Sequence, residues 1–187
     1  MRETVVVVPD GLAADENGNT LEFPSFAYRA VLDYVRERFH GHQVILAPAN
    51  TFGSSKAEQE VAALYLGKFD TVLIVCPSPC GAKYIDTRGN ADLLRDYLRE
   101  SGRWPLGEVL LACAFRHSAR AALCFKKAGF SIKQVVAVHY EIPKEENIVG
   151  ALFYYRIPAA HWLYEKLAHV RDFLKMAYAP DHDGRRK

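Results

Sequence analysis

Two arginines and a histidine stand close together near the middle of the chain, directly after an apolar stretch. Arg116, His117 and Arg120 follow the segment EVLLACA at 108–114. Because residues three apart share one face of a helix, His117 and Arg120 can point in the same direction. A guanidinium group suits phosphate or carboxylate, and an imidazole exchanges protons near neutral pH. The group therefore indicates an anion site with His117 as general acid or base; the plainer alternative is an ion pair between Arg120 and a carboxylate such as Asp86.

Further polar side chains follow the ends of other predicted strands and complete the candidate site. The candidate catalytic carboxylates, which would orient the histidine, are Glu58 and Asp86. The candidate ligand-binding residues are Asp10, Ser55, Thr87, Asn90, Arg116 and Arg120. Structural roles compete with these assignments, because Asp86 or Thr87 can cap a helix. Glu58 also stands three residues after Ser55, which is the spacing of a capping box.

Several motifs that would identify a cofactor or a metal are missing from the sequence. The chain has neither GxxxxGK[ST] nor GxGxxG, and neither GxSxG nor HExxH. Cys76 and Cys80 form the segment CPSPC, but no second Cys/His pair with zinc-ligand spacing stands nearby. We therefore expect no metal site, and the cofactor stays unknown from the sequence.

The elements that must position these residues alternate between apolar strands and amphipathic helices. We expect strands over 4–9, 43–47, 70–76, 108–114 and 131–140. We expect helices over 25–39, 54–66, 89–101, 117–128 and 157–178. This alternation predicts the α/β class, as a Rossmann-like three-layer sandwich with a mostly parallel five-stranded sheet and an added C-terminal helix.

The domain organisation follows from the same pattern. We expect one domain over 1–187, with a core over 4–140 and a helical extension over 157–178 that covers the sheet or forms a homodimer face. The carboxyl ends of parallel strands meet at one edge of the sheet, where ligands bind in open α/β folds. The candidate site residues therefore share this edge.

The composition excludes several classes of partner. The chain has 187 residues, of which 50% are hydrophobic and 25% charged, and its formal net charge is +2. This balance carries no signature of a nucleic-acid or membrane partner. The start, MRETVVVVPDG, has too short an apolar run for a signal peptide, and no stretch reaches the length of a transmembrane helix. We therefore expect a cytoplasmic protein whose partner is a small anionic ligand.

Two segments resemble the YdcF/SanA/ElyC-like family of domains of unknown function. That family typically shows an N-T-x-E-N-A stretch and then a V-T-S-x-x-H-x-x-R-A stretch. Here DTRGNA at 86–91 is similar to the first, and His117, Arg120 and Ala121 match the second. The segment CFKKAGF at 124–130 resembles the end of the family's next helix. Upstream, AEQEVAALYL resembles the family's S-E-A helix, so that the likeness extends over about 4–140.

The departures from the family pattern fall on one side of the site. Ala57 replaces the serine of S-E-A, Gly89 stands where a glutamate is common, and Cys113 and Ala114 replace a Thr-Ser pair. The candidate site thus has fewer acidic and hydroxyl side chains than the family pattern, and it keeps the basic ones. This difference allows a changed substrate or a lost activity. The resemblance implies a Rossmann-like domain. Together with the basic residues of the candidate site, the resemblance leads us to expect an enzyme that acts on a small phosphorylated or nucleotide-like substrate. The alternative that it implies is a nucleotide or S-adenosylmethionine binding module without hydrolytic activity.

Overall fold

A five-stranded parallel sheet forms the centre of the protein. The computed structural model describes residues 3–67, 73–78, 84–142 and 157–178. The strands of the central sheet are β1 (Thr4–Val7), β4 (Gln43–Leu46), β5 (Leu73–Val75), β6 (Glu108–Ala114) and β7 (Ser131–Val138). They lie in the order β5-β4-β1-β6-β7, and every neighbouring pair is parallel. The predicted α/β class with its parallel five-stranded sheet is confirmed.

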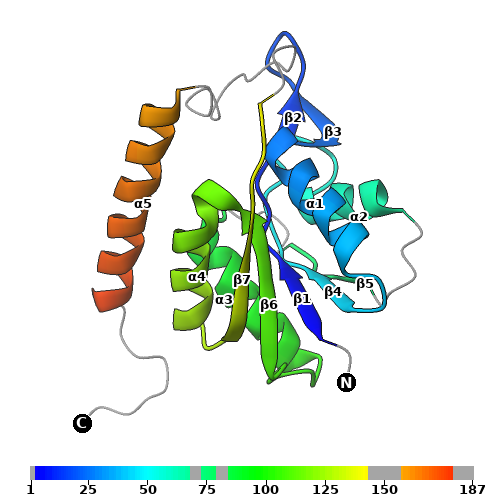
Figure 1. The fold of residues 1–187 in the computed structure, drawn as a ribbon, viewed down its shortest axis with the longest axis vertical. Helices are drawn as coiled ribbons and strands as arrows, with labels where there is room; N and C mark the ends of the chain where they lie inside the picture. Colours follow the sequence, from blue (N-terminus) through cyan, green and yellow to red (C-terminus); the bar gives the residue numbers. More distant parts are fainter. Residues whose placement is uncertain (1–2, 68–72, 79–83, 143–156, 179–187) are drawn as a thin grey trace.

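Helices cover both faces of the sheet, as Figure 1 shows. Helices α1 (Phe26–Arg38) and α2 (Glu58–Leu66) lie on one face, and α3 (Thr87–Glu100) and α4 (Ser118–Lys127) lie on the other. The central strand β1 explains why both faces are apolar. Val5 and Val7 belong to the core beneath α1 and α2, whereas Val6 and Val8 belong to the core beneath α3 and α4. Successive side chains of a strand point to opposite faces, so a run of four valines fits a strand that is covered twice.

Local hydrogen bonds set where the helices begin near the carboxyl edge. The hydroxyl of Ser25 accepts from the Tyr28 amide at 3.1 Å and donates to the Asp10 carbonyl at 2.7 Å, which caps α1 and ties it to the end of β1. The Asp86 carboxylate accepts from the Gly89 amide at 2.9 Å and caps α3, as one sequence alternative expected. The capping box of Ser55 and Glu58 does not form, because α2 begins at Glu58 itself.

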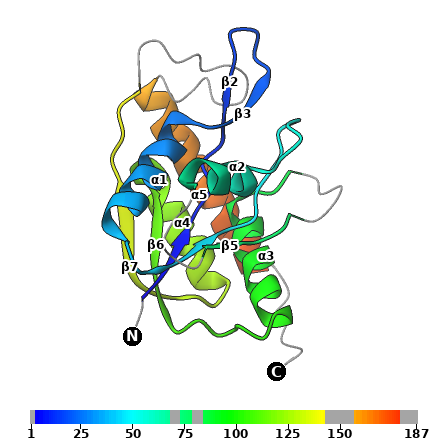
Figure 2. The ribbon, with the colours of Figure 1, turned by 90° about the vertical axis from the view of Figure 1, so that its right-hand side faces the viewer.

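A small hairpin was not predicted from the sequence. Strands β2 (Leu12–Ala14) and β3 (Thr20–Pro24) pair antiparallel and project beyond the carboxyl edge of the sheet (Figure 2). The Asp15 carboxylate accepts from the Asn17 and Asn19 amides at 2.9 and 2.8 Å and so closes the turn. Strands this short show too little alternation for a pattern to reveal them.

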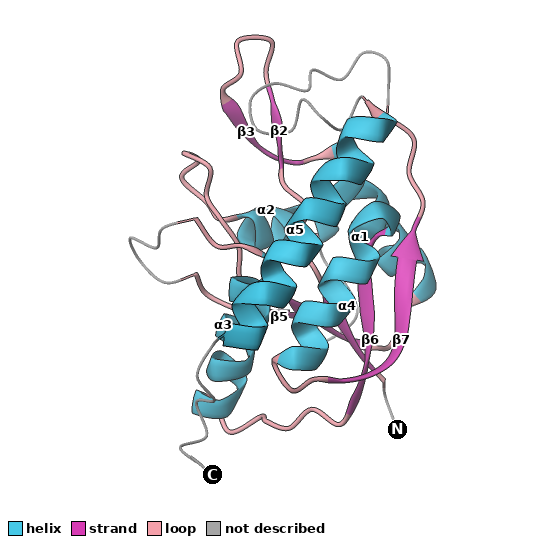
Figure 3. Ribbon diagram, turned by 90° about the vertical axis from the view of Figure 1, so that its left-hand side faces the viewer, coloured by secondary structure: helices cyan, strands magenta, loops and turns pink. Residues whose placement is uncertain are grey.

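The C-terminal helix packs mainly on α4 and lies outside the three-layer sandwich. Figures 1 and 3 show α5 (Pro158–Tyr178) running beside α4. The buried residues on its described part are His161, Ala168 and Asp172. Its exposed apolar residues are Trp162, Leu163, Leu167, Val170, Phe173 and Leu174. The helix thus docks through a largely polar stripe rather than by covering the sheet with apolar side chains. No described helix combines the length and hydropathy that a membrane crossing needs.

Candidate functional site

A small polar cavity lies where the strand order reverses, at the carboxyl ends of β1 and β6. Its volume is about 70 Å³. Six of the nine candidate site residues line it, namely Asp10, Glu58, Thr87, Asn90, His117 and Arg120. The strands on the two sides of β1 are followed by helices on opposite faces, so the loops diverge here and leave a crevice. Residues separated by more than a hundred positions in the sequence therefore meet at this point.

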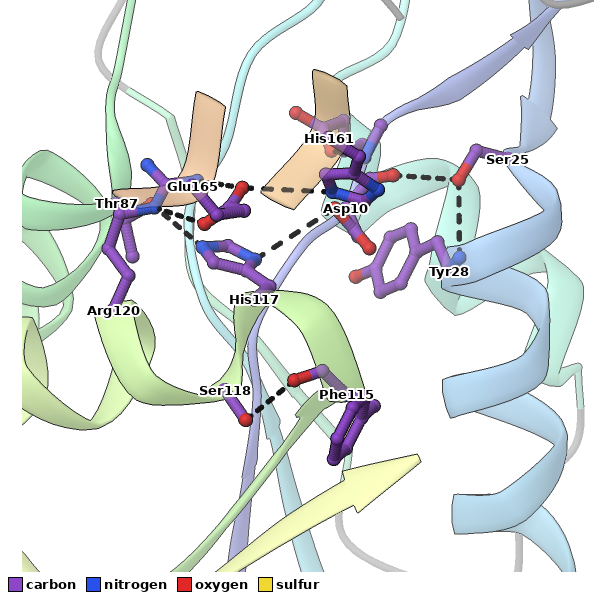
Figure 4. A network of polar contacts seen from close by, with 12 residues as sticks. Asp10, Ser25, Tyr28, Thr87, Phe115, His117, Ser118, Arg120, His161 and Glu165 are labelled. Atoms are coloured by element: carbon purple, nitrogen blue, oxygen red, sulfur yellow. Dashed lines mark hydrogen bonds and ion pairs between the residues drawn. The ribbon is translucent and has the colours of Figure 1, made fainter. Parts of the chain in front are cut away.

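His117 lies at the centre of the site, between a hydroxyl and a carboxylate (Figure 4). It ends the 3₁₀ turn η1 (Phe115–His117), which joins β6 to α4. Its Nε2 atom is 2.9 Å from the Thr87 hydroxyl oxygen, and its Nδ1 atom is 3.8 Å from a carboxylate oxygen of Asp10. The carboxylate favours the tautomer with the proton on Nδ1, which leaves Nε2 to accept from Thr87. Burial lowers the pKa of His117 well below its ordinary value, and Arg120 adds to this effect, so the imidazole is neutral at pH 7.

A second carboxyl group faces the same cavity from the start of α2. Glu58 is buried, and its two oxygens accept from the backbone amides of Gly11 at 2.6 Å and Asn50 at 3.3 Å. Burial raises the pKa of Glu58 from 4.5 to about 7, and the neighbouring charge of Asp10 adds to the rise, while the two amide donors oppose it. The site thus contains a carboxyl group that gives up its proton near neutral pH.

The raised pKa of Glu58 predicts a distinctive dependence of stability on pH. In the unfolded chain the group ionises near pH 4.5, whereas in the folded protein it stays protonated until about pH 7. Stability from this group is therefore present in full below pH 4.5, falls by about 3 kcal/mol up to pH 7 and stays constant above it, since one pKa unit is worth about 1.4 kcal/mol.

Chemical denaturation of wild type and Glu58→Gln across this pH range measures the effect. We expect the difference between the two free energies of unfolding to change by about 3 kcal/mol. Glu37→Gln, on the exposed side of α1, controls for the loss of one carboxylate. Parallel pH curves for wild type and Glu58→Gln would contradict the prediction.

Two asparagines hold the loops that form the cavity wall. The Asn50 side chain accepts from the Ile85 amide at 2.7 Å and donates to the Ile85 carbonyl at 2.8 Å. The Asn90 amide donates to the Pro48 carbonyl at 2.5 Å. These bonds join the loop after β4 to the start of α3. Asn90 was predicted to bind a ligand, and the structure shows its nitrogen committed to the backbone.

Arg120 forms an ion pair, but its partner differs from the one that the sequence suggested. Its Nε and Nη2 atoms donate to the two oxygens of Glu165 in α5, at 2.9 and 3.1 Å. A carboxylate oxygen of Asp172 lies 3.8 Å from Nη1. Burial opposes the positive charge, but these carboxylates outweigh it and raise the pKa of Arg120 further above its ordinary value. The guanidinium is therefore charged, buried and held by the C-terminal helix.

Three candidate residues lie outside the small cavity. Ser55 is exposed and donates its hydroxyl proton to Glu22 of the hairpin. Asp86 caps α3, and its other oxygen lies 3.8 Å from Arg171 of α5. Arg116 does not line the small cavity and instead donates to His161 Nδ1 at 3.1 Å. Their positions in the sequence put all three near the carboxyl edge of the sheet, as expected, but their contacts hold their side chains outside the small cavity.

Several residues of the site lie on α5 and are not among the candidates that the sequence indicates. Tyr164 lines the small cavity, Glu165 holds Arg120, and His161 contacts Arg116. Burial lowers the pKa of His161 to about 4, with Arg116 and Arg120 contributing. The spacing of these residues does place them together, because positions 161, 165, 168 and 172 are four, three and four residues apart and so lie on one face of a helix. Polar side chains dominate that face, so its pattern does not indicate a buried one.

Metal binding finds no support in the described part of the chain. Among residues 3–67, 73–78, 84–142 and 157–178, no three His, Cys, Asp or Glu residues form a group that could hold a metal ion. Cys76, Cys113 and Cys124 are buried free thiols, and burial raises the pKa of each to about 12. Cys80, the second cysteine of CPSPC, lies outside the described residues.

The fold and the cavity define a class of protein rather than a particular one. The protein is an α/β domain of Rossmann-like topology with an acid–base cluster at the switch point of its parallel sheet. The chain matches none of the family models, curated proteins or solved structures with which it was compared. Its function must therefore be inferred from its own residues and their geometry.

Proposed function

We propose that the cavity is the active site of an enzyme acting on a small anionic substrate, phosphorylated or nucleotide-like, with His117 as general base. The observation that carries this proposal is the contact of His117 with the Thr87 hydroxyl on one side and the Asp10 carboxylate on the other. A hydroxyl, an imidazole and a carboxylate in this order form the arrangement that activates an oxygen nucleophile.

Each group has a defined part in the proposed reaction. Neutral His117 accepts at Nε2 the proton of the Thr87 hydroxyl, or of a water or substrate hydroxyl that takes its place. Asp10 then stabilises the imidazolium through the Nδ1 proton. Glu58, which is protonated up to about pH 7, supplies a proton to the leaving group. Arg120 binds the anionic group, because its charged fork lies in the wall of the same cavity.

The grouping of these residues also supports the proposal that the chain is a YdcF-like protein. Thr87, Asn90, His117 and Arg120 carry the resemblance to that family, and all four line one cavity of about 70 Å³. Motif residues that were scattered over the surface would have argued against a shared functional origin. Ala57 and Gly89, at which the chain departs from the family pattern, do not line this cavity.

A ligand panel with product analysis tests the proposed function. The panel contains nucleotides, sugar phosphates, inorganic phosphate and S-adenosylmethionine, and both the melting temperature and the products are measured. At a hundredfold excess over Kd, we expect a true ligand to raise Tm by about 5 °C or more, and an enzyme to consume it.

The results of the panel separate the two classes of function. Stabilisation with turnover that is lost in Thr87→Val or His117→Ala supports the enzyme. Stabilisation without any product supports the alternative, a nucleotide or S-adenosylmethionine binding module. No stabilisation by any compound of the panel would refute both.

A further inference from the structure

A second and larger cavity lies beside the proposed active site, between the start of α4 and the outer helix α5. Its volume is about 520 Å³, within the range of about 300–1,000 Å³ that small-molecule sites occupy. Phe115 of η1 and Trp162 of α5 contribute aromatic walls, and they are 48% and 62% exposed. We call this cavity the α4–α5 groove.

The charges in the α4–α5 groove favour an anion. Arg116 and Lys166 line it, and the Lys166 ammonium lies 5.8 Å from the centre of the Trp162 ring. Among the described residues that line the groove, Glu165 is the one carboxylate, and the bidentate bond to Arg120 already neutralises it. A ligand with an aromatic ring and a negatively charged group thus matches both the aromatic walls and the positive charge of the groove.

Arg120 connects the groove to the active site. Its side chain lines both cavities, so the ion pair with Glu165 forms part of the boundary between them. The active-site cavity of about 70 Å³ is too small for a phosphorylated metabolite. A substrate that reaches His117 must therefore keep most of its volume in a neighbouring space, and the groove is adjacent and large enough.

Glu165 already shows how an anionic group would meet Arg120. Its two oxygens take both hydrogen bonds of the guanidinium fork, as a carboxylate or phosphate of a ligand would. Burial raises the pKa of Glu165, with Arg120 opposing that rise, so the buried carboxylate carries a desolvation cost. An incoming anion can take its place while Glu165 turns toward the open side of the groove.

We propose that the α4–α5 groove binds the aromatic body of an organic anion, whose charged group replaces Glu165 at Arg120. The proposal rests on the proposed function and adds the substrate class: an aryl phosphate or a similar aromatic anion rather than a small inorganic one. Lys166 and Arg116 attract the anion, Phe115 and Trp162 contact its ring, and Arg120 presents its charged group to His117.

Calorimetric titration with three probes tests the groove: 1-naphthyl phosphate, inorganic phosphate and uncharged 1-naphthol. We expect 1-naphthyl phosphate to bind wild type at least tenfold more tightly than either of the other two. Trp162→Ala is expected to weaken 1-naphthyl phosphate about tenfold and to leave inorganic phosphate unchanged. Leu163→Ala is the matched control, because Leu163 is the next residue of α5, is 52% exposed and does not line the groove.

Glu165→Gln provides a second readout at the ion pair. It keeps the shape of the side chain and removes the competing charge, so we expect both phosphate probes to bind about tenfold more tightly than to wild type. The proposal for the groove would be wrong if wild type bound the two phosphate probes with equal affinity. It would also be wrong if Trp162→Ala and Leu163→Ala changed the affinity for 1-naphthyl phosphate equally. A third contradicting result is that 1-naphthol binds as tightly as 1-naphthyl phosphate, because the charged group would then contribute nothing to the affinity.

Failure of the proposed function would look different. If the groove alone is wrong, inorganic phosphate still binds wild type, it binds Glu165→Gln more tightly, and the naphthyl ring adds nothing to the affinity. If the proposed function is wrong, inorganic phosphate binds neither wild type nor Glu165→Gln, and no compound of the panel is turned over.

Discussion

Replacing Arg120 by leucine is expected to release α5 from α4 and to cost about 3–5 kcal/mol of stability. The reason is that the substitution leaves the buried carboxylate of Glu165 without its counter-charge and leaves that of Asp172 with Arg171 alone. The side chain of Glu165 is 11% exposed and that of Asp172 is 0% exposed. A charge buried in this way is far more costly alone than in a hydrogen-bonded pair. Because the docked face of α5 has few apolar contacts, this loss is not compensated elsewhere on the helix.

Limited proteolysis of α5 and chemical denaturation measure this loss. Arg88→Leu is the matched control, because Arg88 pairs with Asp92 on α3 where the two side chains are 24% and 31% exposed. Such a pair is worth about 0–1 kcal/mol. We expect α5 to become cleavable in Arg120→Leu and to remain protected in Arg88→Leu. Equal protection and equal stability in the two variants would show that the ion pair does not hold the helix.

Replacing His117 by alanine is expected to lower kcat/KM by about 100- to 10,000-fold for any substrate that the panel identifies. The substitution removes the group that accepts the proton of the oxygen nucleophile at this position. Asp10 lies on the far side of His117 from Thr87, so it cannot take over that role directly. The rate that remains reflects substrate binding at Arg120 and the proton of Glu58.

Steady-state kinetics across pH, with a folding check by circular dichroism, measure the His117 effect. His42→Ala is the control, since His42 lies near Glu3 at the opposite edge of the sheet and we expect it to retain full activity. A further comparison separates base catalysis from ligand binding: loss of the base lowers kcat, whereas loss of a binding contact raises KM. Activity in His117→Ala within twofold of wild type would remove the histidine from the mechanism.

The alternation of apolar and amphipathic segments was enough to predict the architecture. The valines at 5–8 indicate a strand buried on both faces, and the structure places it at the centre of a parallel sheet. The same reasoning placed Asp10, Glu58, Thr87 and His117 at one edge, where they line one cavity. It placed Ser55 there too, but the Ser55 hydroxyl donates to Glu22 and the residue does not line the cavity.

The chain order of strands and helices follows from local periodicity, which each segment carries in its own residues. That order determined the fold class and the edge at which the polar loops gather. Only the tertiary structure decided which of those side chains face one another, because that choice depends on packing between residues far apart in the chain. The partner of Arg120 illustrates the difference: Glu165 stands 45 positions away, on a helix whose docked face is polar, and no local pattern links the two. Such contacts form because a charge that is removed from water needs an opposite charge beside it. Burial of this kind exists only in the folded protein.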